Sequence, residues 1–140
     1  KIFNEIKISF ILKGYQIIVI PSLRTPKEII DLAINEFNEN GYIVKTVDKQ
    51  AYLSALALAT KIVVTCDSTS MISEAAASGK PIFVAHMSSK RDNYRFKKFF
   101  KLFREIGITK DLGEKSESWK YKKFNEAERI ASVIRSKIQI

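Results

Sequence analysis

The chain has 140 residues, of which 46% are hydrophobic and 28% charged, values typical of a soluble globular domain with its own core. Lys and Arg number 24 against 15 acidic residues, a net charge of +9 that favours anionic partners such as phosphates, nucleic acid or an acidic membrane surface. No apolar run approaches the roughly 20 residues needed to span a bilayer. The single cysteine excludes an internal disulfide, and the single histidine argues against a Cys/His zinc site, so we expect no metal site.

The first sixty residues predict alternating helices and strands. Gly14 interrupts the first apolar pattern, in which Ile and Phe recur at roughly helical spacing. Thr25 followed by Pro26 is typical of an N-cap residue before a helix with Pro at its first position. Gly41 is expected to close that helix. In chain order we expect a helix over 1–13, a strand over 16–20, a helix from Pro26 to about Asn40, a strand over 42–47 and a helix over 51–60.

Residues 61–86 contain the clearest strand–helix–strand pattern in the chain. The first strand is rich in β-branched residues, and the small polar residues from Cys66 to Ser70 suit a turn and a helix N-cap. Gly79 is expected just after the helix, and Pro81 prevents its continuation. The expected elements are a strand over 61–65, a helix over 71–78 and a strand over 82–85, a parallel crossover of about minimum length.

Alternating helices and apolar strands predict a parallel sheet that is covered by helices on both faces. The strands over 16–20, 42–47, 61–65 and 82–85 should form its centre. The sequence therefore predicts an α/β fold, a three-layer doubly wound parallel sheet of the Rossmann-like kind. No internal repeat or low-complexity linker is present, so we expect a single domain over residues 1–140.

Beyond residue 88 the composition becomes basic and aromatic. Residues 88–104 combine four phenylalanines at i, i+3, i+4 and i+7 spacing with seven Lys or Arg residues, which predicts a helix ended by Gly107. The aromatic face should pack in the core, and the basic face is either simply solvated or turned toward an acidic membrane surface. A short strand is expected near Ile108, and a final helix after its N-cap Asn125.

In a doubly wound sheet, ligands bind beyond the carboxyl ends of the strands. Three expected loops lie there, at residues 22–25, 67–70 and 86–90. Hydroxyls and backbone N–H groups at a helix N-terminus bind phosphate, and arginine makes bidentate phosphate contacts. The candidates for phosphate binding are Arg24, Ser68, Thr69 and Ser70, and the residues expected close to a ligand are Ser22, Asp67, His86 and Lys90.

Several candidates also have a purely structural explanation. Glu74, one turn into the helix, could accept hydrogen bonds from a sugar diol or could be an exposed helix carboxylate. Asp67 could serve only as a helix cap, and His86 only in packing. Cys66 is expected to be a small buried residue, since no His/Asp pair that would activate a nucleophile is evident nearby. The absence of G-x-G-x-x-G and Walker motifs argues against a dinucleotide oxidoreductase and a P-loop NTPase, and we expect no cofactor.

Three segments of the chain resemble the ELM1-like family, a group of glycosyltransferase-like proteins related to a mitochondrial fission factor. Residues 22–26 read SLRTP where the family has SRRTP. Residues 63–84 read VVTCDSTSMISEAAASGKPIFV where the family has TEDSxSMISEA followed by GKP, and this match is the most specific. Farther on, Trp119, Tyr121 and residues 124–126 resemble the family's W-x-Y-x-P-L-x-E-T ending.

The resemblance implies the C-terminal, donor-binding half of a GT-B-type glycosyltransferase. The spacing D-S-x-x-x-x-x-E followed by G-K-P is also similar to that of UDP-N-acetylglucosamine 2-epimerases, in which the Ser holds the diphosphate and the Glu holds the ribose. By this resemblance Ser68, Thr69 and Ser70 would bind phosphate, and Glu74 would bind the ribose of a nucleotide-diphosphate sugar. An N-terminal domain or a separate chain would bring the acceptor, so this chain alone should be inactive, and its catalytic residues stay unassigned.

Three departures from the family pattern leave a second function open. Leu23 replaces an arginine, Cys66 replaces a glutamate eight positions before Glu74, and residues 50–52 (QAY) replace Asn-Pro-Tyr. The alternative is a non-catalytic binding or scaffold module that recruits a protein or a membrane. Nucleic-acid binding is the weakest interpretation, since no recognised motif accompanies the charge. A reducing compartment suits the lone cysteine, so we expect a cytoplasmic location, either free or at the inner face of a membrane.

Overall fold

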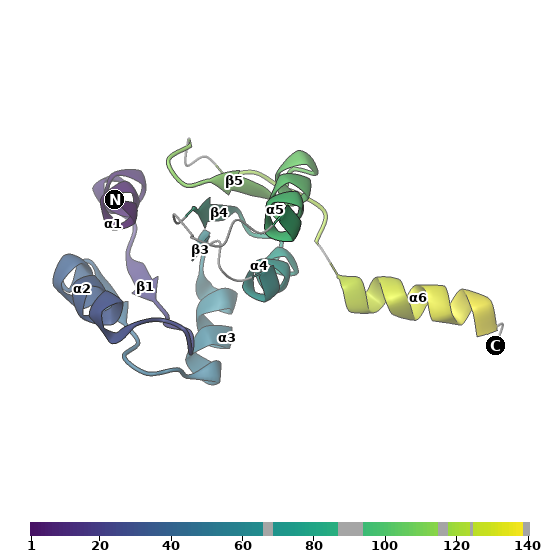
Figure 1. Ribbon diagram of the computed structural model, residues 1–140, viewed down its shortest axis with the longest axis horizontal. Helices are drawn as coiled ribbons and strands as arrows, with labels where there is room; N and C mark the ends of the chain where they lie inside the picture. The colour runs from purple at the N-terminus through teal and green to yellow at the C-terminus, as the bar shows by residue number, and fades with distance from the viewer. Residues whose placement is uncertain (66–68, 87–93, 115–117, 124, 139–140) are drawn as a thin grey trace. The chain divides into compact units, whose positions relative to one another are not determined.

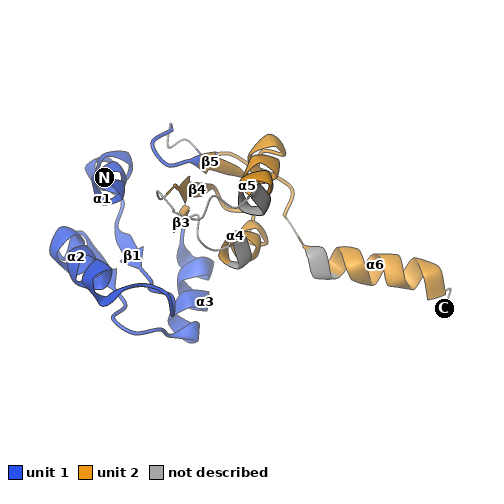
Figure 2. Ribbon diagram, viewed as in Figure 1, with its two compact units in different colours: residues 1–60, 111–118 blue, residues 61–110, 119–140 orange. Residues whose placement is uncertain are grey.

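A computed structural model describes residues 1–65, 69–86, 94–114, 118–123 and 125–138 (Figure 1). The chain divides into two compact units (Figure 2). Unit 1 comprises residues 1–60 and 111–118, and unit 2 comprises residues 61–110 and 119–140. The single domain expected from the sequence stays a prediction.

Unit 1 contains a two-stranded parallel sheet, in which β1 (Ile17–Val19) pairs with β2 (Gly41–Ile43). Ile17 lies opposite Gly41 in the register of this pair. Figure 1 shows the helices of this unit in purple and blue. They are α1 (Ile2–Ser9), the short 3-10 helix η1 (Ile11–Lys13), α2 (Lys27–Phe37) and α3 (Lys49–Leu58).

The core of unit 1 lies on one face of the β1–β2 sheet. Phe37 of α2 is fully buried and packs with Ile43 of β2. Phe3 of α1 meets Phe37 edge-on, with ring centroids 5.2 Å apart and an interplanar angle of 85°. Because strand side chains alternate between faces, Ile18 and Tyr42 lie opposite each other on the other face, where they are 51% and 70% exposed.

The N-terminus of α2 differs from the expectation. Pro26 is itself the N-cap, with an extended ψ of 146°, and no side chain caps the helix. The Thr25 hydroxyl accepts a hydrogen bond from the Ser22 N–H, so it stabilises the preceding loop. The start of α3 also differs, because Asp48 accepts hydrogen bonds from the Gln50 and Ala51 N–H groups at 2.9 and 3.1 Å and the helix begins at residue 49.

The sequence predicted that Gly41 closes α2, and this prediction is wrong. The helix ends at Phe37, and Gly41 is instead the first residue of β2. A Cβ atom added at Gly41 would run into the carbonyl oxygen of Ile17 on the paired strand. The glycine is therefore needed for the close approach of two backbones, a role that hydrophobic periodicity does not reveal.

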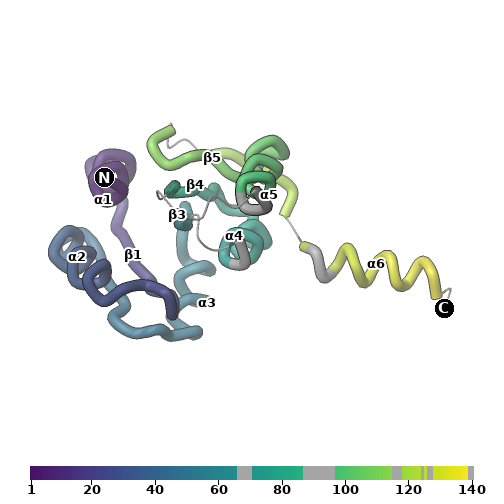
Figure 3. The backbone as a smooth tube through the Cα atoms, viewed as in Figure 1, coloured from purple at the N-terminus to yellow at the C-terminus, as the bar shows by residue number. Residues whose placement is uncertain are grey.

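Unit 2 contains the strand–helix–strand crossover predicted for residues 61–86. Its sheet has the order β3-β4-β5, and β3 and β4 are parallel. Gly79 follows α4 with a positive φ of 74°, in agreement with its expected place at the helix end. The elements are β3 (Ile62–Thr65), α4 (Thr69–Ala76), β4 (Ile82–Ala85), α5 (Tyr94–Glu105), β5 (Thr109–Asp111, at the unit boundary) and α6 (Glu126–Ile138), and Figure 3 traces them as a tube.

The core of unit 2 is built around β4, all of whose residues are buried. Ile72 of α4 and Phe103 of α5 are also buried, at 0% and 3% exposure. Asn125 caps α6 as expected, because its Oδ1 accepts the Glu128 N–H at 3.1 Å and its Nδ2 donates to the Glu128 carboxylate at 3.1 Å. The first of these is the usual N-cap bond to the third helical residue, and the second joins the two side chains.

The α/β class predicted from the sequence is confirmed. Strands alternate with helices along the chain, and the strand pairs β1–β2 and β3–β4 are parallel, as in Rossmann-like folds. The four expected central strands occur in two hydrogen-bonded sheets, one in each unit. Within the described part of the chain, no helix is both long enough and apolar enough to cross a membrane.

Candidate functional site

The loop between β1 and α2 forms a tight turn rich in hydroxyls. The Ser22 N–H donates to Thr25 Oγ1 at 2.9 Å, and the Thr25 N–H donates to the Ser22 carbonyl oxygen at 3.1 Å. The two hydroxyl oxygens lie 3.3 Å apart, and the Arg24 N–H donates to Ser22 Oγ at 3.2 Å. The structure thus brings the expected residues Ser22 and Arg24 together in one turn, with the Arg24 side chain exposed.

Leu23 occupies the same turn and is 91% exposed. The neighbouring hydrogen bonds of Ser22 and Arg24 hold the backbone on both sides of it. An aliphatic side chain at this position can make no polar contact to a phosphate, so of these two residues only Arg24 can bind an anion through its side chain.

The β3–α4–β4 crossover supplies the second candidate region. Thr65 lies opposite Ala85 in the parallel register, so the chain leaves β3 and β4 at neighbouring points of one sheet edge. α4 begins at Thr69, with Ser70 in its first turn. The first turn of a helix leaves backbone N–H groups without intrahelical partners, and together with the helix dipole these groups form an anion site.

Several predicted residues of this region fall outside the described part of the chain. They are Cys66, Asp67, Ser68 and Lys90. Thr69 and Ser70 are described by their backbone alone. The assignment of Ser68, Thr69 and Ser70 to phosphate binding therefore stays a prediction. The described part of this region is the backbone at the start of α4.

Glu74 lies on the exposed side of α4. The opposite side of the helix is formed by Ile72, Ala75 and Ala76, which are buried. Helical side chains in general lean toward the helix N-terminus, which for Glu74 is the end of α4 nearer the candidate site. A ligand could reach Glu74 only from the solvent side, and its role as a ribose ligand stays a prediction.

His86 follows directly after β4 and is exposed. Its ring meets that of Phe100 on α5 edge-on, with centroids 6.0 Å apart and an interplanar angle of 83°. The aromatic contact fixes the orientation of the imidazole at the carboxyl end of the strand. His86 therefore has a packing role and is also placed where a ligand of this sheet would bind.

The segment 118–123 contributes contacts that the residue-by-residue reading of the sequence did not foresee. Trp119 meets Phe83 of β4 edge-on, with centroids 5.1 Å apart at 84°, and the Lys110 ammonium lies 4.7 Å from the centroid of the Trp119 ring. The indole nitrogen of Trp119 is buried and has no hydrogen-bond partner among the described residues. The alternation of aromatic residues and lysines in WKYK (119–122) was the available signal, because a period of two is typical of an extended segment with one buried face.

Tyr121 anchors the same segment to the turn between α4 and β4. Its hydroxyl donates to the Lys80 carbonyl oxygen at 2.7 Å. Burial raises the pKa of Tyr121 to about 12, and a hydrogen bond with Ser78 offsets part of this increase. The Ser78 hydroxyl in turn donates to the Ala75 carbonyl oxygen at the end of α4. These contacts stabilise the turn between α4 and β4, at the opposite end of α4 from the candidate site.

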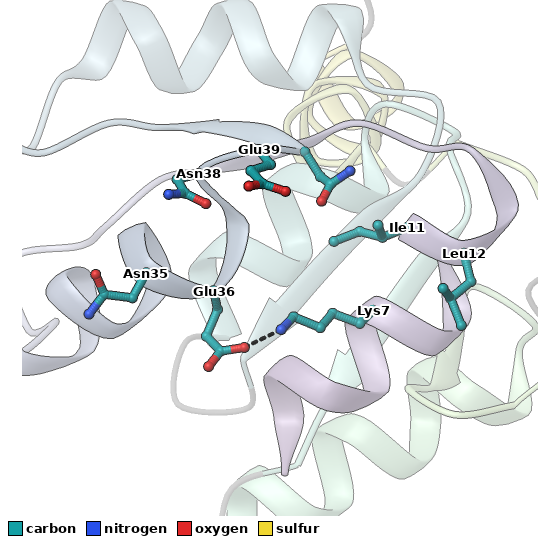
Figure 4. A pocket seen from close by; sticks show the side chains of 8 residues that line it. Lys7, Ile11, Leu12, Asn35, Glu36, Asn38 and Glu39 are labelled. Atoms are coloured by element: carbon teal, nitrogen blue, oxygen red, sulfur yellow. Dashed lines mark hydrogen bonds and ion pairs between the residues drawn. The ribbon is translucent and has the colours of Figure 1, made fainter.

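A polar pocket of about 400 Å³ lies in unit 1, between the first helical segments and the C-terminal end of α2 (Figure 4). An ion pair between Lys7 and Glu36 crosses it. Its cation is thus already paired with a carboxylate of the pocket, and this recess makes a poorer anion site than the two loops. The other lining residues are Ile11, Leu12, Asn35, Asn38, Glu39 and Asn40.

The described residues contain no group of three or more His, Cys, Asp or Glu side chains that could hold a metal ion. The polar groups of the two loops are instead hydroxyls, a guanidinium, an imidazole and helix N–H groups. Groups of these kinds can bind an anion by hydrogen bonds and charge, and the described residues of each loop include no evident nucleophile activated by a base.

Comparison with known proteins places these loops in a family context. The chain belongs to the mitochondrial fission ELM1 family, whose model matches residues 1–138. It is 31% identical over 122 residues to the mitochondrial fission protein ELM1 of Arabidopsis thaliana, covering 84% of this chain and 28% of that protein. It is 32% identical over 126 residues to the uncharacterized protein RP120 of Rickettsia prowazekii, covering 85% of this chain and 35% of that protein.

The chain spans about a third of the length of the curated relatives it matches, at 28% and 35%. No solved structure matches it. The family resemblance drawn from the 22–26 and 63–84 segments is therefore confirmed, while the chemistry of these segments is argued from their geometry.

Proposed function

We propose that this chain is the donor-binding half of a GT-B-type glycosyltransferase and binds a nucleotide-diphosphate sugar at the N-terminus of α4. The observation that carries the proposal is the β3–α4–β4 crossover, whose helix begins at the carboxyl edge of two parallel strands. In open α/β sheets this edge is the usual ligand-binding position. A diphosphate there would accept hydrogen bonds from backbone N–H groups of the first helical turn.

The side chains around this edge supply complementary groups for a nucleotide-diphosphate sugar. The hydroxyls of Ser68, Thr69 and Ser70 would supplement the backbone N–H groups, and Glu74 would accept hydrogen bonds from the ribose hydroxyls. Each of these roles follows from the chemistry of the residue and is open to test by substitution.

The acceptor would be bound elsewhere, either by another domain or by a separate chain. In support, the chain matches only about a third of the length of its curated relatives. Binding of the donor and transfer of the sugar are then separable, so we propose that this chain binds nucleotide without turnover on its own. We place this activity in the cytoplasm, where the lone cysteine is expected to stay reduced.

A second candidate function is that of a non-catalytic scaffold. Leu23, 91% exposed at the position where the related family pattern has an arginine, favours it, because it exchanges a phosphate contact for an apolar one. The Arabidopsis relative, named a mitochondrial fission protein, carries no enzymatic term in its name. In this case the turn at 22–25 would contact a protein partner.

Titration with nucleoside diphosphates distinguishes the two functions. UDP, GDP and ADP are added separately to the isotopically labelled chain, and amide shifts are followed by NMR. The proposal expects saturable shifts that include the first turn of α4 and Glu74 with at least one nucleotide. Absence of binding at millimolar nucleotide, about −4 kcal/mol on the affinity scale, would reject the donor site and leave the scaffold.

A further inference from the structure

The net positive charge of the chain lies in one of its two units. Residues 61–110 and 119–140 carry 16 Lys or Arg against 6 Asp or Glu, whereas residues 1–60 and 111–118 carry 8 against 9. The whole excess that gives the net charge of +9 therefore belongs to unit 2. A charge concentrated in this way creates a local field that attracts anionic surfaces over about a Debye length.

Within unit 2, the helix α5 separates its aromatic and basic residues on different sides. Phe103 is 3% exposed, and Phe99 stacks on it with ring centroids 4.4 Å apart. Phe99 also meets Phe100 edge-on at 5.6 Å. The aromatic face predicted from the sequence is therefore a packing face. The exposed side of the same helix carries Lys97, Lys98, Lys101 and Arg104.

Two aliphatic side chains interrupt this basic side. Leu102 and Ile106 are 51% and 52% exposed. The Ile106 N–H donates to the Leu102 carbonyl oxygen at 3.0 Å, so the two residues are stacked one helical turn apart. Lys98 precedes Leu102 by one further turn, which places a cation in line with the aliphatic pair. Lys101 pairs with Glu105 at 3.8 Å. Both side chains are exposed and such pairs are weak, so the Lys101 ammonium can exchange Glu105 for another anion.

We propose that α5 docks on the surface of an anionic lipid bilayer, with Leu102 and Ile106 inserted at the boundary between headgroups and acyl chains. Lys98 and Lys101 would then lie at the level of the lipid phosphates. The aromatic face of α5 packs within the protein, so it is the exposed side that would meet the bilayer, where lysines attract anionic headgroups and the two aliphatic side chains bury apolar surface. Complementary charge identifies the occupant as anionic, and the exposed aliphatic pair identifies it as lipid.

A nucleic acid fits the same helix less well. Binding of single-stranded nucleic acid relies on aromatic side chains that stack on bases, and Phe99, Phe100 and Phe103 instead pack against one another or into the core. Contact with a phosphate backbone would not bury the apolar surface of Leu102 and Ile106. The proposal is independent of the nucleotide site at α4, since it uses a different helix.

Vesicle flotation tests the proposal with the intact chain. Phosphatidylcholine vesicles with and without one third of phosphatidylglycerol are mixed with the protein at low and high salt. We expect flotation with the anionic vesicles, reduced by salt and absent with neutral ones. Lys98→Gln with Lys101→Gln should lower the partition coefficient about 25-fold, since each lysine near an anionic surface contributes about fivefold. The matched control is Lys120→Gln with Lys122→Gln, which removes the same charge from an exposed segment of the same unit and should lower it far less.

The aliphatic pair is tested separately from the charge. Leu102→Ser with Ile106→Ser keeps every cation, and it should lower the partition coefficient at least tenfold while the thermal transition stays within a few degrees, because both side chains are half exposed. In a Cys66→Ser background, an environment-sensitive dye at Leu102→Cys should shift to the blue on anionic vesicles, whereas the same dye at Lys120→Cys should not. These two readouts separate insertion from simple charge attraction.

Three results would overturn the proposal. The first is equal flotation with neutral and anionic vesicles. The second is a Leu102/Ile106 double variant that floats as well as the parent chain, since charge alone would then explain the binding. The third is binding of a single-stranded RNA oligonucleotide that is tighter than vesicle binding and insensitive to the same variant, which would assign the basic side of α5 to nucleic acid.

Discussion

The Tyr121 hydroxyl donates a hydrogen bond of 2.7 Å to the carbonyl oxygen of Lys80, a residue 41 positions earlier in the chain. Lys80 lies between α4 and β4, so the bond ties the crossover to the segment that precedes α6. This contact explains why an aromatic residue with a hydroxyl stands at position 121, where burial alone would be satisfied by phenylalanine.

Replacement of Tyr121 by Phe should lower the free energy of unfolding by about 1 kcal/mol, the usual net value of a buried neutral hydrogen bond. Chemical denaturation followed by both tryptophan fluorescence and circular dichroism measures the change. Tyr42→Phe is the control, because Tyr42 is 70% exposed and its hydroxyl should contribute little. Equal effects of the two substitutions would show that the Tyr121–Lys80 bond adds no net stability.

Tyr121 should also titrate later than an ordinary tyrosine. Burial raises its pKa to about 12 from the ordinary tyrosine value of 10.0, so the folded state holds the phenolic proton more tightly than the unfolded state does. Its contribution to stability is then fully present below pH 10 and is lost as the pH rises from 10 to 12. Ultraviolet titration should show one of the five tyrosines ionising late, and this late component should be absent from Tyr121→Phe. Uniform titration of all the tyrosines would contradict the assignment.

Gly41→Ala should destabilise the chain by about 2–4 kcal/mol, because the new methyl group would meet the Ile17 carbonyl oxygen and force β1 and β2 apart. Gly113→Ala is the matched control. Among the described residues, its chain neighbours aside, no heavy atom lies within 4 Å of a Cβ added at Gly113, where the positive φ of 99° is unfavourable at a cost of about 1 kcal/mol. Denaturant midpoints of the two variants measure the difference, and a smaller loss at Gly41 than at Gly113 would refute the close-approach explanation.

Glu74→Gln should weaken nucleotide binding by about 1.5–3 kcal/mol, the range for hydrogen bonds to a charged group. Its effect on stability should stay within about 0.5 kcal/mol, because Glu74 is exposed on α4. Calorimetric titration measures the affinity, and Glu105→Gln serves as control, as an exposed helical glutamate of the same unit. Unchanged affinity together with a markedly lower melting temperature would make Glu74 a structural residue.

The elements that could be predicted from the sequence are those in which local pattern and burial agree. β4 matches its expected range of 82–85 because all its residues are apolar and Pro81 precedes it. Asn125 could be identified as a cap because the capping preference is local in the chain. By contrast, the role of Gly41 depends on Ile17, its partner in the sheet, and a single sequence does not reveal which strands pair.

In the candidate site, too, local features could be predicted from the sequence and features that depend on distant residues could not. The turn at residues 22–25 was foreseen as a polar loop, and its hydrogen bonds between Ser22, Arg24 and Thr25 are local. The exposed orientation of Glu74 follows from the buried positions of Ile72 and Ala75, which depend on the packing of α4 against the sheet. The contacts of Trp119 and Tyr121 join residues tens of positions apart, so they could not be predicted from the sequence, in which these two residues stand out only by family resemblance and an alternating pattern.

The packing of Trp119 against Phe83 has an optical consequence. Trp119 is the sole tryptophan of the chain, and its described ring contacts, Phe83 and Lys110, belong to unit 2. Its emission is therefore a reporter of unit 2 alone, whereas the circular dichroism of the peptide groups records the helices of both units. If the two signals are lost at different denaturant concentrations, the units unfold as separate cooperative blocks. If the signals coincide, the 140 residues unfold together.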